Sequence, residues 1–218
     1  MKRVLYFFMI LLVATSCDKL DLPMKKNQKY NGKALDPNTN MTAWEFMNSR
    51  QDLFSNMIAA IEKVDEDLDE DDPTRIKPYY TEIDNNKRYT FLLLNNIAFS
   101  ATDLNNINSE VRKENCRNVL RFHIIQGEYN GYENLNFTPI FVVTLWNDPR
   151  AIMSIKVAFG ITANRGSYER IEAQDQCGAS TARGSISSNY KFKNGWGHIF
   201  QNKLQYRADL SSTTAPAL

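Results

Sequence analysis

The sequence predicts an α+β fold with a single domain, in which helices pack against a β-sandwich or wedge. Helical periodicity dominates residues 42–127, where apolar side chains recur at intervals of three and four residues. After residue 128 the pattern changes to short segments that are rich in β-branched and aromatic residues and are separated by turn signals. The sequence contains no internal repeat, so one copy of one domain is the simplest interpretation.

The first two helices are predicted by a cap and an apolar stripe. Thr42 and Glu45 form the pattern of a capping box, which places a helix start at Thr42. A second helix is expected over residues 51–64, because apolar residues recur there at i, i+4 spacing. The acidic run at 65–72 then predicts a solvated loop. Calcium binding is the weaker alternative, since the run lacks the glycine that a calcium loop uses for its turn.

The middle of the chain predicts one buried strand followed by two helices. Residues 88–94 are a short apolar run that is typical of a buried strand. A short helix is expected from Ala98 to about Leu104, and a longer one over 110–123, after which Gly127 permits a sharp exit. The inward face of the longer helix is predicted to hold Val111, Cys116, Val119, Leu120 and His123.

The last third of the chain predicts strands separated by turns. Asn194-Gly195 is a strong hairpin signal, and residues 147–150 have the composition of a turn. Residues 174–184 are polar and predict a loop. The expected strands cover residues 140–145, 152–159, 185–192 and 197–206, with a weaker one over 168–171.

The N-terminal segment has the order of a secretory signal: basic Lys2 and Arg3, an apolar run, and small residues. These small residues are followed directly by Cys17, and this pattern resembles a bacterial lipobox. The resemblance implies that Cys17 is lipidated and becomes the new N-terminus after cleavage. Ordinary signal cleavage nearby is the alternative. The expected organisation is a lipoprotein signal peptide over 1–16, a lipid-anchored flexible tether over 17–41, a domain over 42–207 and a flexible tail over 208–218.

The residues after Cys17 bear on location. Asp18, Lys19 and Asp21 loosely fit a signal that sends lipoproteins to the outer face of the outer membrane, so we expect a surface-exposed lipoprotein of the cell envelope. The whole chain has 26 basic and 25 acidic side chains, and loss of Lys2 and Arg3 leaves 24 against 25, a balance of −1. This neutrality predicts no nucleic-acid partner.

The remaining cysteines, Cys116 and Cys177, would share an oxidising compartment. A disulfide between them and two separate thiols both stay open, because sequence does not give the distance between their α-carbons. The sequence has no serine-hydrolase elbow, phosphate-binding loop or dinucleotide fingerprint, so we expect no enzyme and no cofactor.

Four segments in order resemble the fasciclin (FAS1) domain over roughly residues 42–207. The helix at 51–64 is similar to the opening helix of the family, and residues 90–99 to its Thr-x-Phe motif, with matches at Thr90, Phe91, Asn96, Ala98 and Phe99. Residues 118–129 resemble the Leu-x-Tyr-His motif with its later glycine, and residues 194–200 the closing Asn-Gly-x-x-His strand. The resemblance implies a fasciclin-like domain and an adhesive role.

The candidate binding residues follow from this resemblance and from the aromatic content. Phe122 and His123 occupy the positions that the family uses in some receptor contacts, although Phe122 replaces the usual tyrosine. A metal or acid–base site at His123 and His198 is the weaker interpretation, and imidazoles that satisfy buried backbone groups are the stronger one. The candidates for stacking on sugar rings are Trp146, Trp196, Tyr129 and Tyr132, with Trp196 favoured because it follows Asn-Gly at a turn.

The expected function is a lipid-anchored cell-surface module that binds or adheres to a protein. The alternative is a glycan-capture accessory lipoprotein of an outer-membrane nutrient-uptake transporter complex. In both cases Cys17 holds the chain to the membrane and the ligand lies at the cell surface.

Overall fold

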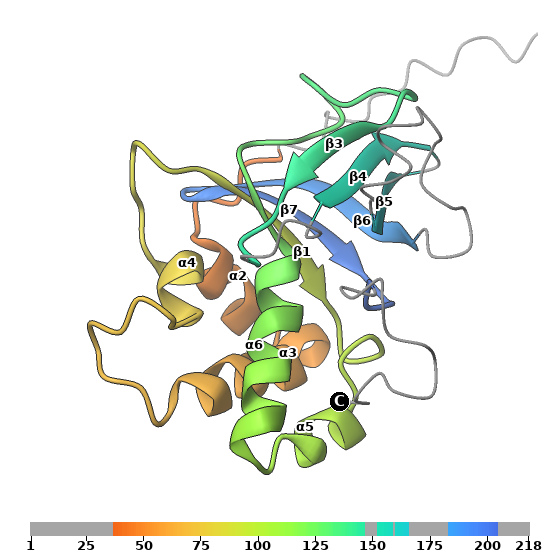
Figure 1. Cartoon of the computed structure of the whole chain (residues 1–218). Helices are drawn as coiled ribbons and strands as arrows, with labels where there is room; N and C mark the ends of the chain where they lie inside the picture. Colours follow the sequence, from red (N-terminus) through yellow and green to blue (C-terminus); the bar gives the residue numbers. More distant parts are fainter. Residues whose placement is uncertain (1–36, 147–151, 159, 166–182, 205–218) are drawn as a thin grey trace, which may run out of the picture. The chain divides into compact units, whose positions relative to one another are not determined.

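The computed structural model describes residues 37–146, 152–158, 160–165 and 183–204, which belong to one compact unit that begins at Pro37 (Figure 1). The expected mixture of helices and strands is present. The helices are α2 (Ala43–Ser49), α3 (Gln51–Asp65), α4 (Lys77–Thr81), α5 (Ala101–Asn106) and α6 (Glu110–Phe122). The strands are β1 (Tyr89–Leu94), β2 (Ile124–Gln126), β3 (Ile140–Val143), β4 (Ile152–Val157), β5 (Ile161–Arg165), β6 (Arg183–Phe192) and β7 (Gly195–Phe200).

Local side-chain bonds decide where two of the helices begin. Thr42 and Glu45 form the predicted capping box of α2, with Glu45 N donating to Thr42 Oγ1 at 3.2 Å. Helix α5 begins at Ala101 and not at Ala98, because Ser100 and Asp103 form a second capping box. The backbone N–H of Ala98 instead donates to Asn95 Oδ1, which fixes a turn after β1.

Helix α6 begins at Glu110 as predicted and ends at Phe122, one residue before the predicted end, and the predicted inward face needs one correction. Cys116, Val119, Leu120 and His123 are buried, whereas Val111 is 72% exposed. Val111 lies in the first turn of the helix, before the stretch that packs on α3.

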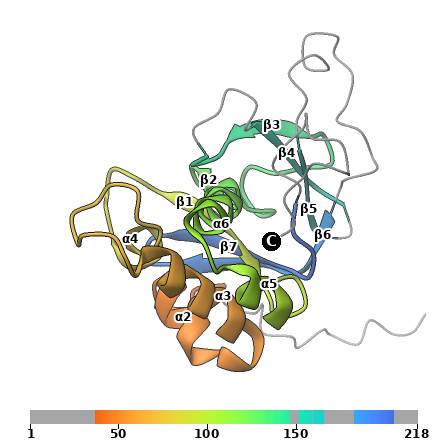
Figure 2. The ribbon, with the colours of Figure 1, turned by 60° about the horizontal axis from the view of Figure 1, so that its bottom comes forward.

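The sheet has the strand order β2-β1-β7-β6-β5-β4-β3 among the described strands. The predicted strand at 88–94 is confirmed as β1, which pairs antiparallel with β2 and parallel with β7. From Thr90 to Leu94 every residue of β1 is buried, as expected for a strand with neighbours on both edges and packed faces. Helices α2 to α6 lie together beside β1 and β7, away from β3, β4 and β5 (Figures 1 and 2).

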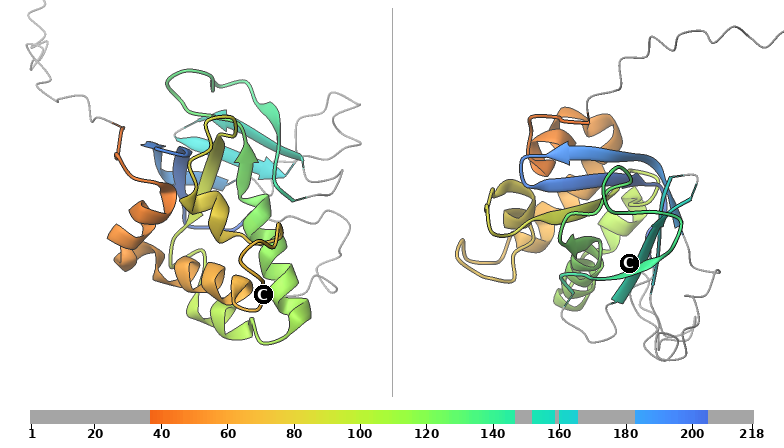
Figure 3. Two further views of the ribbon diagram at one scale, coloured as in Figure 1. Left: turned by 90° about the vertical axis from the view of Figure 1, so that its left-hand side faces the viewer. Right: turned by 90° about the horizontal axis from the view of Figure 1, so that it is seen from above.

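The predicted sandwich or wedge is replaced by one curled sheet whose two ends meet. Ile125 of β2 forms a bridge with Thr144 just after β3, and Leu145 N donates to Ile124 O at 2.9 Å. The ten-residue strand β6 links the two parts of the curl: Arg183 and Gly184 pair with β5, and residues 185–192 pair with β7. Two register shifts within the pairing with β7 bend the strand. Figure 3 shows the turn of the sheet from β7 through β6 to β5.

Several boundaries differ from those predicted. Strand β5 lies where no strand was expected, and residues 183–184 open β6 although they were assigned to a loop. The folded unit begins before Thr42, since Lys191 N donates to Pro37 O at 2.7 Å and Thr39 N donates to Lys191 O. The predicted turn at 147–150, the strand at 168–171, the tail and the N-terminal segment with Cys17 lie outside the described residues.

The start of β7 requires a glycine. Residues 193–194 connect β6 to β7, and Gly195 already pairs with Phe192 and with Tyr89 of β1. Gly195 has a φ of 149°, and a Cβ atom placed there would lie 1.9 Å from Tyr89 O. Any larger residue would therefore push β7 away from β1.

We predict that Gly195→Ala destabilises the protein by roughly 2–4 kcal/mol, because the added carbon collides with backbone that cannot move alone. Urea unfolding monitored by circular dichroism measures the loss. Gly184→Ala is the matched control, since a Cβ atom there meets nothing within 4 Å. Equal effects of the two substitutions would contradict this account of β7.

Candidate functional site

The structure places Phe122 and His123 in the core, which corrects their assignment as surface-binding residues. Both side chains are fully buried, because the last turn of α6 faces the interior before the chain enters β2. The Phe122 ring packs edge-on against His123 and against Trp146, with centroid separations of 6.0 and 6.2 Å. A direct contact of Phe122 or His123 with a partner is therefore excluded in this structure.

His123 joins the end of α6 to the segment after β7. Its Nδ1 donates to Val119 O at 2.7 Å, and its Nε2 accepts the backbone N–H of Leu204 at 3.0 Å. Lys203, next to Leu204, forms an ion pair with Asp103 at 2.7 Å and so fixes the same segment to α5. Burial lowers the pKa of His123 to about 4, so its ring is neutral near pH 7.

His198 makes a second bridge with the opposite tautomer. Its Nδ1 accepts the N–H of Asn189 at 3.1 Å, and its Nε2 donates to Tyr129 O at 3.0 Å. Burial lowers the pKa of His198 to about 4 as well. Both nitrogens of both histidines are thus engaged with backbone groups, which confirms the stronger interpretation and leaves no lone pair for a metal ion.

Trp196 is also buried, at 3% exposure, so the prediction that it offers an exposed stacking face is wrong. The connection between β6 and β7 is shorter than expected, and Trp196 is already inside β7 opposite Thr90. Lys191 lies over its ring at 5.6 Å and Tyr132 packs at its side, so the ring is covered by other side chains.

Trp146 is the one predicted candidate that reaches a surface depression in the described part of the chain. It is half-buried, stacks edge-on against Phe122, and lines a depression with a volume of about 410 Å³. Phe122 therefore supports Trp146 from behind. A binding role for Trp146 stays a prediction.

Three adjoining depressions surround Tyr79, and we call them together the Tyr79 groove. Each is lined by Tyr79, and their volumes are about 320, 410 and 530 Å³. The first and third also share Lys87 and Tyr89, and the second and third share Leu145, so the depressions lie next to one another. Tyr79 and Tyr89 were not singled out from the sequence. The available signal was the adjacent pair Tyr79-Tyr80 shortly after the acidic run at 65–72.

Helix α4 positions Tyr79 at the surface by burying its neighbour. The Tyr80 ring lies in the core against Phe91, with centroids 5.0 Å apart, and consecutive helical residues point in different directions. Asn194 holds the helix from behind, since its Nδ2 donates to Tyr79 O at 3.1 Å and to Tyr80 O at 2.9 Å. The Oδ1 atom of Asn194 accepts the N–H of Ala43 at the start of α2.

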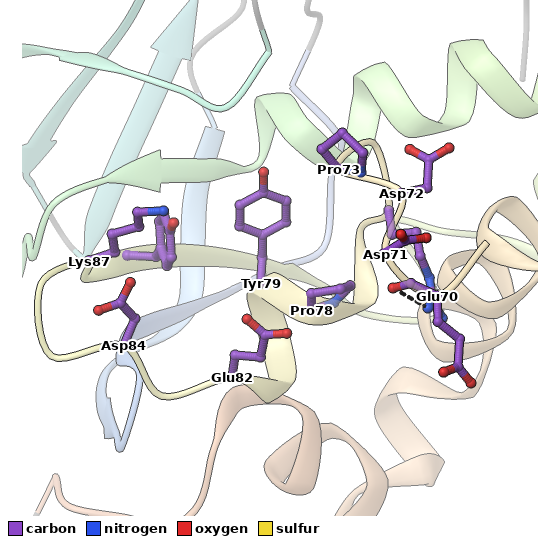
Figure 4. Close-up of a pocket in the computed structure, with 11 residues that line it drawn as sticks. Glu70, Asp71, Asp72, Pro73, Pro78, Tyr79, Glu82, Asp84 and Lys87 are labelled. Atoms are coloured by element: carbon purple, nitrogen blue, oxygen red, sulfur yellow. Dashed lines mark hydrogen bonds between the residues drawn. The ribbon is translucent and has the colours of Figure 1, made fainter. Parts of the chain in front are cut away.

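The Tyr79 ring stands between two sets of polar side chains (Figure 4). On one side lie Asp84 and Lys87, and on the other side residues 70–73 of the acidic run, with Glu82 below the ring. Tyr89 packs edge-on against Tyr79 at 5.5 Å. Partial burial, and then Tyr79, Asp84 and Glu82, raise the pKa of the Tyr89 phenol, so it is a hydrogen-bond donor at neutral pH.

Hydrogen bonds anchor the acidic run to the domain more firmly than the predicted solvated loop would require. Asp65 is buried, and its carboxylate accepts the N–H groups of Ile76 and Lys77, which closes the segment at its base. Arg117 of α6 donates to Val64 O, and Arg121 donates to Thr74 O at 2.7 Å. This rim of the Tyr79 groove is thus held by α6, while most of its carboxylates face solvent.

The described residues contain no group of three or more His, Cys, Asp or Glu side chains suited to a metal ion. None of the described helices is long and apolar enough to cross a membrane. Cys116 is a free, buried thiol, and burial raises its pKa to about 12. Cys177 lies outside the described residues.

No family model matches the chain, and no curated protein matches it. One solved structure that is similar contains a FAS1 domain pair from the insect cell adhesion molecule Fasciclin I. The similarity covers 70% of this chain and 46% of that chain, with 18% sequence identity and a TM-score of 0.43. The chain thus spans about half the length of that domain pair.

The two neutral histidines predict a pH dependence of folding. Their folded pKa of about 4 lies below the ordinary value of 6.5, so the unfolded chain binds more protons between these values. The contribution of each neutral histidine to the free energy of unfolding is fully present above about pH 6.5. This contribution, about 3 kcal/mol for each histidine, is lost as the pH falls through 4. Urea unfolding at pH 7.5, 6.5, 5.5 and 4.5 measures this loss.

The double variant His123→Gln, His198→Gln is the control for this dependence. We expect it to be less stable at pH 7.5, because buried backbone groups lose partners, and to show a flatter profile between pH 6.5 and 4.5. A variant with the same slope as the unchanged protein would show that other groups cause the dependence.

Proposed function

We propose that the chain is a fasciclin-like domain that is anchored by lipid at Cys17 and exposed on the outer membrane, where it binds a protein or glycan of the cell surface. The Tyr79 groove is the observation that carries the binding role. It combines aromatic rings with fixed polar groups at the surface, as binding sites commonly do.

The way the four fasciclin-like segments meet supports the fasciclin part of this proposal. Asn96 of the first motif donates to Asp52 O and accepts the N–H of Asn56, which joins the motif to the opening helix α3. Strand β1 of that motif pairs with β2, after the His123 motif, and with β7, the closing strand. Residues far apart in sequence therefore form one continuous part of the core.

The proposal includes no catalytic activity. Cys116 and both histidines are buried, and the pKa shifts of all three follow from that burial and not from a partner in an open cleft. The polar side chains that line the Tyr79 groove are carboxylates, amides and basic groups at its surface, a set that suits binding.

Lipid attachment is tested directly at Cys17. We expect the full-length chain in its native cells to incorporate an alkyne-tagged fatty acid and to sediment with the membranes, because acylation anchors a protein without a spanning helix. Cys17→Ala should lose both properties, while Cys116→Ala should keep both. A labelled, membrane-bound Cys17→Ala protein would contradict the anchor.

The binding site is tested by placing the photo-crosslinking residue benzoylphenylalanine at position 79 of the lipidated chain on intact cells. We expect discrete adducts from position 79 and none from position 132, an exposed tyrosine outside the groove. Mass spectrometry then identifies what is attached. No adduct from position 79, or the same adducts from both positions, would refute the Tyr79 groove as the binding site.

A second candidate is the glycan-capture accessory of a nutrient-uptake transporter, and the position of Trp146 in the groove favours it. Adducts to an outer-membrane transporter would support this candidate. Adducts to foreign surface proteins without a transporter would support adhesion.

A further inference from the structure

We propose that the Tyr79 groove takes a carbohydrate chain without net charge, with sugar rings packed against Tyr79 and Trp146. The inference rests on the proposed binding role of the groove and adds the chemical class of its ligand. Two properties of the groove carry it: the presence of aromatic rings in each of its three depressions, and the mixed character of the polar groups that line them with these rings.

Aromatic side chains occur in all three depressions of the groove. Tyr79 and Tyr89 line the first and third, and Tyr79 and Trp146 line the second. A pyranose ring has a face of C–H groups that packs on an aromatic ring, while its hydroxyl groups stay at the edge. Tyrosine and tryptophan suit such a contact, because each joins an apolar ring to a polar atom.

The rings are held rigidly, which lowers the entropy that binding would cost. Tyr79 packs edge-on against Tyr89, and its backbone is tied to Asn194. Trp146 packs edge-on against the buried Phe122. Such preformed aromatic faces lose little side-chain freedom when a ligand arrives.

The polar lining offers both donors and acceptors and both signs of charge. Sugar hydroxyl groups donate and accept, so they match a mixed lining better than a polyanion or a polycation does. Some of these charges are paired with one another, as in the ion pair of Arg121 with Glu114 at 3.4 Å. The lining contains the acceptors Glu70, Asp71, Asp72, Glu82, Asp84 and Glu114, the cations Arg75, Lys87, Arg88 and Arg121, and the amides Asn86, Asn118 and Gln126.

A folded protein partner fits this groove less well. Protein interfaces are usually anchored by a few aromatic or arginine side chains that become fully desolvated in well-packed pockets. Among the lining residues of the three depressions, the aliphatic ones are Leu145, Pro73 and Pro78, and polar side chains surround them. The aromatic rings of the groove are therefore bordered mainly by polar groups, which a folded protein partner would have to desolvate.

The test is affinity electrophoresis of the full-length chain in neutral detergent. Native gels contain one of five soluble polysaccharides: a β-1,3-glucan, a galactomannan, a xyloglucan, an α-glucan or an arabinoxylan, each without charge. Gels with heparin or polygalacturonate give the charged comparison. We expect retardation by at least one neutral polysaccharide and weaker or no retardation by the charged ones.

The variants locate the contact. Tyr79→Ala and Trp146→Ala should each weaken the retardation about tenfold, since each removes one stacking face. Tyr132→Ala is the matched control, an exposed tyrosine outside the groove, and should leave retardation unchanged. Equal midpoints of thermal unfolding for all variants ensure that a loss of retardation reflects weaker binding and not unfolding.

Three outcomes overturn the carbohydrate proposal: no retardation by any neutral polysaccharide, retardation only by charged ones, or retardation that Tyr79→Ala leaves intact. If these occur while position 79 still crosslinks on cells, the binding role stands and its ligand is of another class. If crosslinking fails as well, both proposals fail.

Discussion

The parallel pairing of β1 with β7 is the constraint on which the rest of the structure depends. The two strands align from Tyr89 opposite Gly195 to Leu94 opposite Phe200, and both are buried over almost their whole length. Parallel neighbours cannot be joined by a tight turn, so the chain must leave the sheet and return. That single long connection contains helices α5 and α6 and strands β2 to β6, which together form the rest of the sheet and one side of the helical layer.

Much of the fold was predictable where the signal is local. The capping box at Thr42, the stripe of α3 and the apolar run of β1 each depend on residues a few positions apart. Strand β5 was missed because its residues, Ile-Thr-Ala-Asn-Arg, have little apolar character, and its extended form comes from pairing with β4. The curled sheet was missed for a similar reason, since the bulges of β6 that bend it leave no clear mark in the sequence.

The candidate site was less predictable, because exposure of an aromatic side chain is set by distant contacts. Tyr79 and Tyr80 are adjacent tyrosines, and the packing of the Tyr80 ring against Phe91, which is distant in sequence, decides which of the two rings is buried. Trp196 was expected at a turn, but the short connection draws it into the sheet. The role of the histidines as hydrogen-bond partners of buried backbone groups was predictable. Which backbone groups they bind was not, because some of these groups lie far from the histidines in the sequence.

The bridge from His123 to Leu204 has a consequence for how the protein acquires its structure during synthesis. A growing chain that ends before residue 195 lacks β7 and leaves one edge of β1 open. A chain that ends before residue 204 still leaves the His123 ring without its donor and Asp103 without Lys203. The contacts that join α5 and α6 to the segment after β7 can therefore form only once residue 204 has been synthesised, so the last stage of folding depends on long-range contacts.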